Sequence, residues 1–174
     1  MSKIKITKVF EDLDGCLADW DKLAIDIFGS HPEYDLHLPS KDMWRTIAKY
    51  SKNGQGFFDS LEWISGSKEF WKILKKKTYP AVPTILSGVA IGDWCIKQKT
   101  IWINRELGIN IPRILCFARD KQNYSGPGKL LIDDKQKNLD QWAAMGGETI
   151  LFKSPVQAIR DLEKYDFSEC YLEK

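Results

Sequence analysis

From residue 82 to residue 165, the sequence alternates short apolar segments with longer amphipathic ones. Short apolar runs bounded by turn residues are typical of strands buried on both faces of a sheet. Apolar residues spaced three and four apart indicate helices between these strands. The predicted strands are residues 82–88, 112–118, 129–133 and 148–152, and the predicted helices are residues 93–108, 135–147 and 154–165. Strands that alternate with helices predict an α/β fold, with a Rossmann-like parallel sheet and helices on both faces.

A strand and a helix also precede this alternating region. Residues 4–11 carry β-branched residues in partial alternation, which is typical of a strand. Residues 17–29 have apolar residues at helical spacing and end in a glycine. Residues 29–78 then break the pattern with Pro, Gly and many aromatic residues around two predicted helices, 40–50 and 67–77. Because this segment is too long for an ordinary strand–helix connection, we predict that it forms a small helical cap.

The size and charge of the chain fit one compact core with one insertion. The chain has 174 residues and a net charge of +2, which gives no general attraction to nucleic acid or membranes. It shows neither the apolar segment of a signal peptide nor a run approaching the roughly 18 apolar residues of a membrane span, so we expect a cytoplasmic location. The predicted domains are an α/β core of residues 1–19 and 79–174 and a small helical cap of residues 20–78.

Cysteine and histidine chemistry fits this sequence poorly. The four cysteines are scattered without a CxxC pair, so we expect reduced thiols and no zinc site. His31 and His37 are the only histidines, and both lie in a proline-containing loop. A serine–histidine hydrolase mechanism is therefore disfavoured.

Polar residues end three of the predicted strands. Asp12 and Asp14 follow the first strand, Ser87 ends the second, and Asp133 and Asp134 end the fourth. Ligands of open parallel sheets bind at the carboxyl ends of the strands, so we expect these side chains to meet. Converging carboxylates need a cation or protons to relieve their repulsion, and a set of oxygen ligands favours Mg²⁺. The sequence therefore predicts a magnesium site that could also hold a phosphate group.

These residue types are suited to phosphoryl transfer. An aspartate can attack phosphorus, and a second acid nearby can protonate the leaving oxygen and later activate water. Lys99 and Ser87 can stabilise the negative charge of the transferred group. Each acidic motif alone is also typical of a polar turn after a strand. Their joint occurrence at strand ends, with an intervening lysine, favours catalysis.

The order of these motifs resembles a known family. "VFEDLDGCLAD", "TILSG", Lys99 and "LLIDD" resemble the four motifs of the haloacid dehalogenase-like (HAD) phosphohydrolases, and most closely those of the 5′(3′)-deoxyribonucleotidases. "KTIWINRELG" and "ARDK" are also similar to segments of that branch. The resemblance covers about residues 4–20 and 80–152 and fades in the insertion, where only "DMW" and "GFFDSLEW" are similar.

The resemblance implies roles for the acidic residues and for Lys99. Asp12 would be the nucleophile and a metal ligand, and Asp14 would be the acid/base and a metal ligand through its carbonyl. Asp134 would bind the metal directly, with Asp133 supporting the site. Lys99 would neutralise the nucleophile and the phosphate. Glu11 departs from the family, which usually has an apolar residue just before the nucleophile.

The resemblance also implies a substrate site. Ser87 and the Gly88 N–H would hold the phosphate, although the family often has a second hydroxyl in place of Gly88. Lys121 and Arg119 of "ARDK" would approach the same phosphate. The nucleoside pocket would be lined by Trp20, Met43, Trp44 and Phe58.

The expected function is a Mg²⁺-dependent phosphomonoesterase that acts on (deoxy)nucleoside monophosphates through an aspartyl-phosphate intermediate. One alternative is a HAD phosphatase for a sugar phosphate or a polynucleotide 3′-phosphate, and another is a non-catalytic nucleotide-binding module. The expected partner is a small nucleotide substrate, without a membrane or a stable nucleic-acid partner. The sequence leaves a homodimer open.

Overall fold

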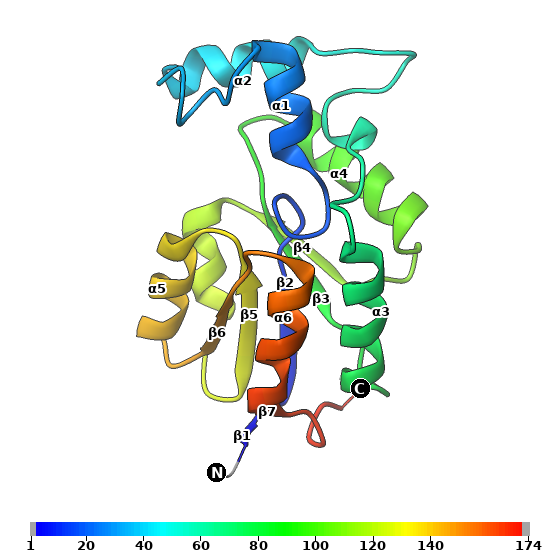
Figure 1. Ribbon diagram of the computed structural model, residues 1–174, viewed down its shortest axis with the longest axis vertical. Coiled ribbons are helices and arrows are strands. Elements are labelled where there is room, and N and C mark those ends of the chain that lie inside the picture. The colour runs from blue at the N-terminus through cyan, green and yellow to red at the C-terminus, as the bar shows by residue number, and fades with distance from the viewer. Residues whose placement is uncertain (1–2, 172–174) are drawn as a thin grey trace.

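The structure is a computed structural model, and it describes residues 3–171. Its centre is a five-stranded parallel sheet with helices on both faces (Figure 1). In the order β4-β3-β2-β5-β6, its strands are Arg113–Cys116, Thr84–Gly88, Lys8–Glu11, Lys129–Asp133 and Glu148–Leu151. The predicted Rossmann-like α/β fold is therefore confirmed.

The central strand β2 explains why the predicted strands are apolar without a clean alternation. Val9 pairs with Leu130 of β5, and Phe10 pairs with Leu131. Val9 and Leu130 belong to the larger core cluster on one side of the sheet, whereas Phe10 and Leu131 belong to a second cluster. Both faces of the sheet are thus covered, as expected for a parallel sheet between helices.

Helices cover the two faces of the sheet. α5 (Gln136–Ala144) packs Trp142 edge-on against Phe10 of β2, with ring centroids 5.1 Å apart. α6 (Pro155–Asp161) lies on the other face, beside α3 (Ser67–Thr78) (Figure 1). α4 (Asp93–Glu106) follows β3 and carries Lys99. Among the described residues, no helix combines the length and apolar character needed to cross a membrane.

Two predicted elements are shorter than expected because the chain pairs elsewhere. The predicted strand 4–11 is divided into β1 (Ile4–Lys5) and β2, because β1 pairs with a short strand, β7 (Tyr165–Asp166), outside the main sheet. The predicted helix 154–165 ends at Asp161 and continues as a 3₁₀ turn, η3 (Leu162–Lys164). A second 3₁₀ segment, η2 (Ala118–Tyr124), follows β4.

The insertion contributes helices above the carboxyl ends of the strands. α1 (Trp20–Phe28), α2 (Ser40–Lys49) and the 3₁₀ turn η1 (Phe58–Ser60) lie at this end of the molecule (Figure 1). α3, the last helix of the predicted cap 20–78, instead runs along α6, and Phe70 contacts Phe152 with ring centroids 5.6 Å apart. The cap boundary stays a prediction, and these contacts favour placing α3 with the core.

Candidate active site

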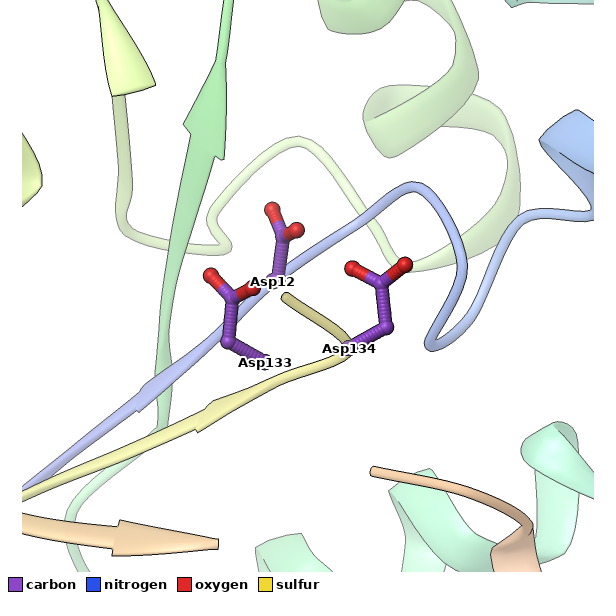
Figure 2. A group of neighbouring side chains, drawn as sticks. All are labelled: Asp12, Asp133 and Asp134. Atoms are coloured by element: carbon purple, nitrogen blue, oxygen red, sulfur yellow. The ribbon is translucent and has the colours of Figure 1, made fainter. Parts of the chain in front are cut away.

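Three carboxylates converge at the carboxyl ends of the neighbouring strands β2 and β5. Asp12 follows β2, Asp133 ends β5 and Asp134 follows it, and Figure 2 shows their side chains pointing into one region. One oxygen from each lies within 4.8 Å of the others. Within residues 3–171, Oδ1 of Asp134 and Oδ1 of nearby Asp14 are buried and accept no hydrogen bond. The oxygen-only set and its unpartnered oxygens fit a Mg²⁺ ion.

Electrostatics also favours a cation at this cluster. Burial, followed by repulsion from Asp12, raises the pKa of Asp134 to about 7. The same two causes, in the same order, raise the pKa of Asp133. A bound divalent cation would relieve this repulsion and hold the carboxylates ionised.

Lys99 reaches Asp14 from α4. The lysine is fully buried, and its Nζ lies 2.5 Å from Oδ2 of Asp14 and 2.9 Å from Oγ of Ser87. It also donates to the carbonyl of Gly88 at 2.6 Å. Burial raises the pKa of Asp14, and Lys99 opposes that shift without cancelling it. A raised pKa suits a carboxyl group to general acid catalysis.

Lys121 binds the other side of the acidic cluster. Its Nζ lies 2.9 Å from Oδ1 of Asp12 and 2.6 Å from Oδ2 of Asp133. Burial lowers the pKa of Lys121, but the carboxylates of Asp12 and Asp133 outweigh burial and raise this pKa above its usual value. Lys121 therefore places a positive charge beside the predicted nucleophile.

Asp133 is occupied by protein donors. Besides Lys121, it accepts the backbone N–H of Lys135 at 2.8 Å and the side chain of Asn138 at 3.0 Å. Asp134 has an unpartnered oxygen instead. This difference supports the prediction that Asp134 is the direct metal ligand and Asp133 a supporting residue.

A cavity of about 150 Å³ opens beside these groups. It is lined by Asp12, Asp14, Gly15, Trp20, Asp21, Glu33, Trp44, Gly88, Ala118, Lys121, Asp134, Lys135 and Asn138. Ser87, predicted to hold phosphate, lies buried behind this wall against Lys99. The cavity thus joins the acidic cluster to two tryptophans.

Two residues of the predicted nucleoside pocket lie elsewhere. Trp20 and Trp44 line the cavity, but Met43 and Phe58 are buried in the core and do not line it. Phe58 packs against the rings of Trp44 and Trp94, with centroid distances of 6.4 and 5.7 Å. Phe58 therefore supports the tryptophan wall from behind.

The structure does not bring Arg119 to the cavity. Its side chain is 78% exposed, and its guanidinium lies 5.3 Å from the centre of the Phe117 ring. Arg119 and Lys121 are two residues apart in η2, where about three residues complete a turn, so their side chains point in different directions. The buried position is taken by Lys121, and the prediction that Arg119 approaches the phosphate is not supported.

Two residues that line the cavity, Asn138 and Lys135, were not predicted from the sequence, and both donate hydrogen bonds to Asp133. Asn138 lies on the first turn of α5 and fixes both oxygens of Asp133. The available signal was a polar residue on the inner side of the helix that follows "IDD", since a motif acid at a strand end needs a donor to orient it.

Glu11, the residue that departs from the family, points into the protein interior. Its side chain is fully buried, and neither carboxylate oxygen has a hydrogen-bond partner among the described residues. Burial, then Asp12 and Asp133, raises the pKa of Glu11 well above its usual value. This raised pKa favours the neutral form of the side chain, which costs less to bury beside Asp12 and Asp133 than a carboxylate would.

Residues 5–166 match the model of a protein family described as 5′ nucleotidase, deoxy (pyrimidine), cytosolic type C protein (NT5C). The chain belongs to this family. Membership confirms the resemblance to HAD-like deoxyribonucleotidases, and this NT5C-family chain is a phosphatase of the 5′-nucleotidase class.

Individual relatives of this NT5C-family chain are distant. It is 25% identical over 160 residues to the human 5′(3′)-deoxyribonucleotidase, cytosolic type, a match that covers 83% of the chain and 79% of the relative. A crystal structure of a hydrolase from Streptococcus pneumoniae TIGR4 superposes with a TM-score of 0.53 and 15% identity. That match covers 92% of this chain and all of the other, and it shows a shared fold.

Proposed function

We propose that this NT5C-family chain is a Mg²⁺-dependent phosphomonoesterase that releases phosphate from (deoxy)nucleoside monophosphates. One observation carries the proposal. Asp12, Asp14, Asp134 and Lys121 line a single cavity, Asp12 and Asp134 belong to an acidic cluster suited to a cation, and the buried Lys99 pairs with Asp14. A nucleophile, a charge-stabilising lysine and a proton donor are the groups that phosphoryl transfer requires.

The reaction follows from these positions in two steps. A carboxylate oxygen of Asp12 attacks phosphorus, the bond from phosphorus to the nucleoside oxygen breaks, and Asp14 gives its proton to that oxygen. Asp14 then takes a proton from water, whose oxygen displaces Asp12 from the aspartyl-phosphate and releases inorganic phosphate. Lys121 and Lys99 offset the negative charge in both steps. Bound Mg²⁺, held by Asp12 and Asp134, would neutralise further charge on the phosphate oxygens.

The tryptophans support a nucleotide substrate. Trp20 and Trp44 line the cavity with ring centroids 6.5 Å apart. Stacking of a base on an aromatic side chain contributes about 1–3 kcal/mol, and a small sugar phosphate would forgo this contact. The name of the human relative supports a preference for deoxyribonucleotides. A cytoplasmic location and a homodimer stay predictions.

The test is phosphate release from a panel of 5′- and 3′-(deoxy)nucleoside monophosphates, with Mg²⁺ or with EDTA. We expect release only with Mg²⁺, and a loss of several orders of magnitude in Asp12→Asn. Asp140→Asn, an exposed acid on α5, is the matched control and should retain activity. Phosphate release from a generic aryl phosphate but from no nucleotide would contradict the proposed nucleotide substrate. Nucleotide binding without any release would favour a binding module.

A further inference from the structure

A second groove adjoins the active-site cavity. It has a volume of about 620 Å³ and is lined by Ser40, Lys41, Trp44, Arg45, Ala48, Val89, Ala90, Ile91, Trp94 and Phe117. Trp44 lines both spaces. The walls also meet along the chain, because Gly88 and Ala118 line the cavity whereas their neighbours Val89 and Phe117 line the groove. The groove is therefore a continuation of the site on the far side of Trp44.

The groove combines apolar surface with positive charge. Trp94 and Phe117 contribute aromatic rings, and Phe117 is 42% exposed. Its charged lining residues are Lys41 and Arg45, and no acidic side chain belongs to this described set. Arg119 adds a third cation at the rim, above the Phe117 ring. Aromatic rings beside lysines and arginines are typical of surfaces that bind single-stranded nucleic acid.

The nearby acids leave these cations available. Arg45 lies 3.0 Å from Asp42, and Arg119 lies 3.9 Å from Asp120. Both pairs are exposed, so each holds its arginine only weakly. A guanidinium has five N–H donors, and one carboxylate partner leaves several of them for a phosphate group.

We propose that the groove binds the second nucleotide of a short single-stranded oligonucleotide whose terminal phosphate reaches Asp12. This inference rests on the proposed function, because the cavity would hold the terminal nucleotide and its phosphate. The bridging phosphate would pass Trp44 and meet Lys41, Arg45 or Arg119, and the next base would stack on Phe117 or Trp94. The bonds made and broken at phosphorus are those of the mononucleotide reaction. The oligonucleotide is a substrate that is released, in keeping with the expected lack of a stable nucleic-acid partner.

The test compares kcat/KM for thymidine monophosphate with kcat/KM for thymidine tetranucleotides that carry one terminal phosphate, at either the 5′ or the 3′ end. We expect hydrolysis of at least one tetranucleotide. The variant Lys41→Ala/Arg45→Ala should lower its kcat/KM about tenfold and change the value for the monophosphate little. Phe117→Ala, on a different segment, should also lower kcat/KM for the tetranucleotide about tenfold, because a stacking contact is lost. Lys72→Ala/Lys76→Ala, exposed on α3, is the charge-matched control.

Salt dependence gives a second readout. Each phosphate contacted on a single strand contributes about −0.7 to the slope of log affinity against log salt concentration. The tetranucleotide should therefore show a steeper fall of kcat/KM with salt than the monophosphate does. The Lys41→Ala/Arg45→Ala variant should bring the two slopes together.

The outcomes separate the groove from the proposed function. Two results would contradict nucleotide binding in the groove but not the proposed phosphatase function. One is hydrolysis of the monophosphate but of neither tetranucleotide, and the other is an equal loss of kcat/KM for both substrates in the groove variants. Tetranucleotide hydrolysis alone, sensitive to the groove variants, supports the groove and overturns the mononucleotide substrate. If neither substrate is hydrolysed, binding of a fluorescent tetranucleotide to Asp12→Asn tests whether the groove holds an oligonucleotide. Binding weakened by the groove substitutions supports the groove, and unchanged binding overturns it.

Discussion

Gly15 lies in the turn after Asp14 with a φ of +79°, and an added Cβ would come within 2.5 Å of Oδ2 of Asp134. Gly15→Ala should thus combine backbone strain with displacement of the predicted metal ligand. Gly29→Ala is the matched control, because its φ is +80° and no atom lies within 4 Å of an added Cβ. Both variants should lose about 1–2 kcal/mol of unfolding free energy.

Of the two variants, only Gly15→Ala should weaken the binding of Mg²⁺. We expect it to raise the Mg²⁺ concentration that gives half-maximal activity about tenfold or more, as for other disturbances around metal ligands. Titration of phosphate release with Mg²⁺ measures this change. Equal Mg²⁺ requirements in the two glycine variants would contradict the role of Asp134.

Glu11 should make the protein sensitive to alkaline pH. Its pKa in the folded protein is raised by burial first and by Asp12 second, so its contribution to stability is fully present below about pH 4.5. That contribution is lost as pH rises through the raised pKa, because the unfolded state then releases the Glu11 proton freely whereas the folded state must keep it or hold a buried charge. Glu11→Gln is neutral at every pH and should not show this loss.

The measurement is urea unfolding of wild type and Glu11→Gln at pH 5 and pH 8, in EDTA. Relative to wild type, the variant should gain about 1 kcal/mol or more between the two pH values. A stability difference that does not change with pH would show that Glu11 is ionised in the folded protein.

At the residue scale, the sequence predicted the meeting of those side chains whose position depends on strand ends. Asp12, Asp14 and Asp134 follow strands of one parallel sheet, so their meeting could be predicted from order alone. The sequence could not show which of Arg119 and Lys121 reaches the acidic cluster, because that depends on how the 3₁₀ segment η2 is rotated. Asn138 was missed because it acts on Asp133 and not on the cavity directly.

At the scale of elements, α6 depends on its first turn. The Ser154 side chain accepts the N–H of Gln157 at 3.2 Å, and Gln157 in turn accepts the N–H of Lys153 at 2.9 Å. Ser154→Ala removes the first bond and should lower the unfolding free energy by about 1 kcal/mol. Because α6 packs against α3, we expect the loss in global unfolding by urea.

Ser154→Asp provides the matched control for this cap. Aspartate keeps a side-chain acceptor at the start of the helix, so it should retain most of the stability. Equal losses in Ser154→Ala and Ser154→Asp would mean that the hydroxyl contributes through packing and not through the hydrogen bond.

The elements themselves were predicted better than their ends. The segments 82–88, 129–133 and 148–152 each contain one observed strand, because buried parallel strands have a strong apolar signal. The division of 4–11 depends on pairing with Tyr165–Asp166, a distant segment that local pattern does not reveal. The packing of α3 on α6 likewise arises from contacts between distant segments.

At the scale of the whole molecule, metal binding should be linked to folding. A ligand that binds only the folded state stabilises it, by about 2.7 kcal/mol at a hundred times its dissociation constant. Mg²⁺ should therefore raise the midpoint of thermal unfolding relative to EDTA. Since the pKa of Asp134 is raised to about 7, protons compete with Mg²⁺ at pH 6 and much less at pH 8.

The increase in midpoint should therefore be larger at pH 8 than at pH 6. Asp134→Asn should lose most of the increase at both pH values, whereas Asp140→Asn, on the exposed side of α5, should retain it. A stabilisation by Mg²⁺ that is the same at both pH values would place the cation elsewhere on the molecule.

The order of the strands has a consequence for synthesis of the protein. β2 lies between β3 and β5, so the strand made earliest in this sheet has both neighbours still to come. The ribosome needs on the order of ten seconds to proceed from Asp12 to Asp134. Both edges of β2 lack their partners until Thr84–Gly88 has been made, and the edge that pairs with β5 lacks its partner for nearly all of that time. The predicted site, which needs both Asp12 and Asp134, therefore stays incomplete in the nascent chain until β5 has emerged.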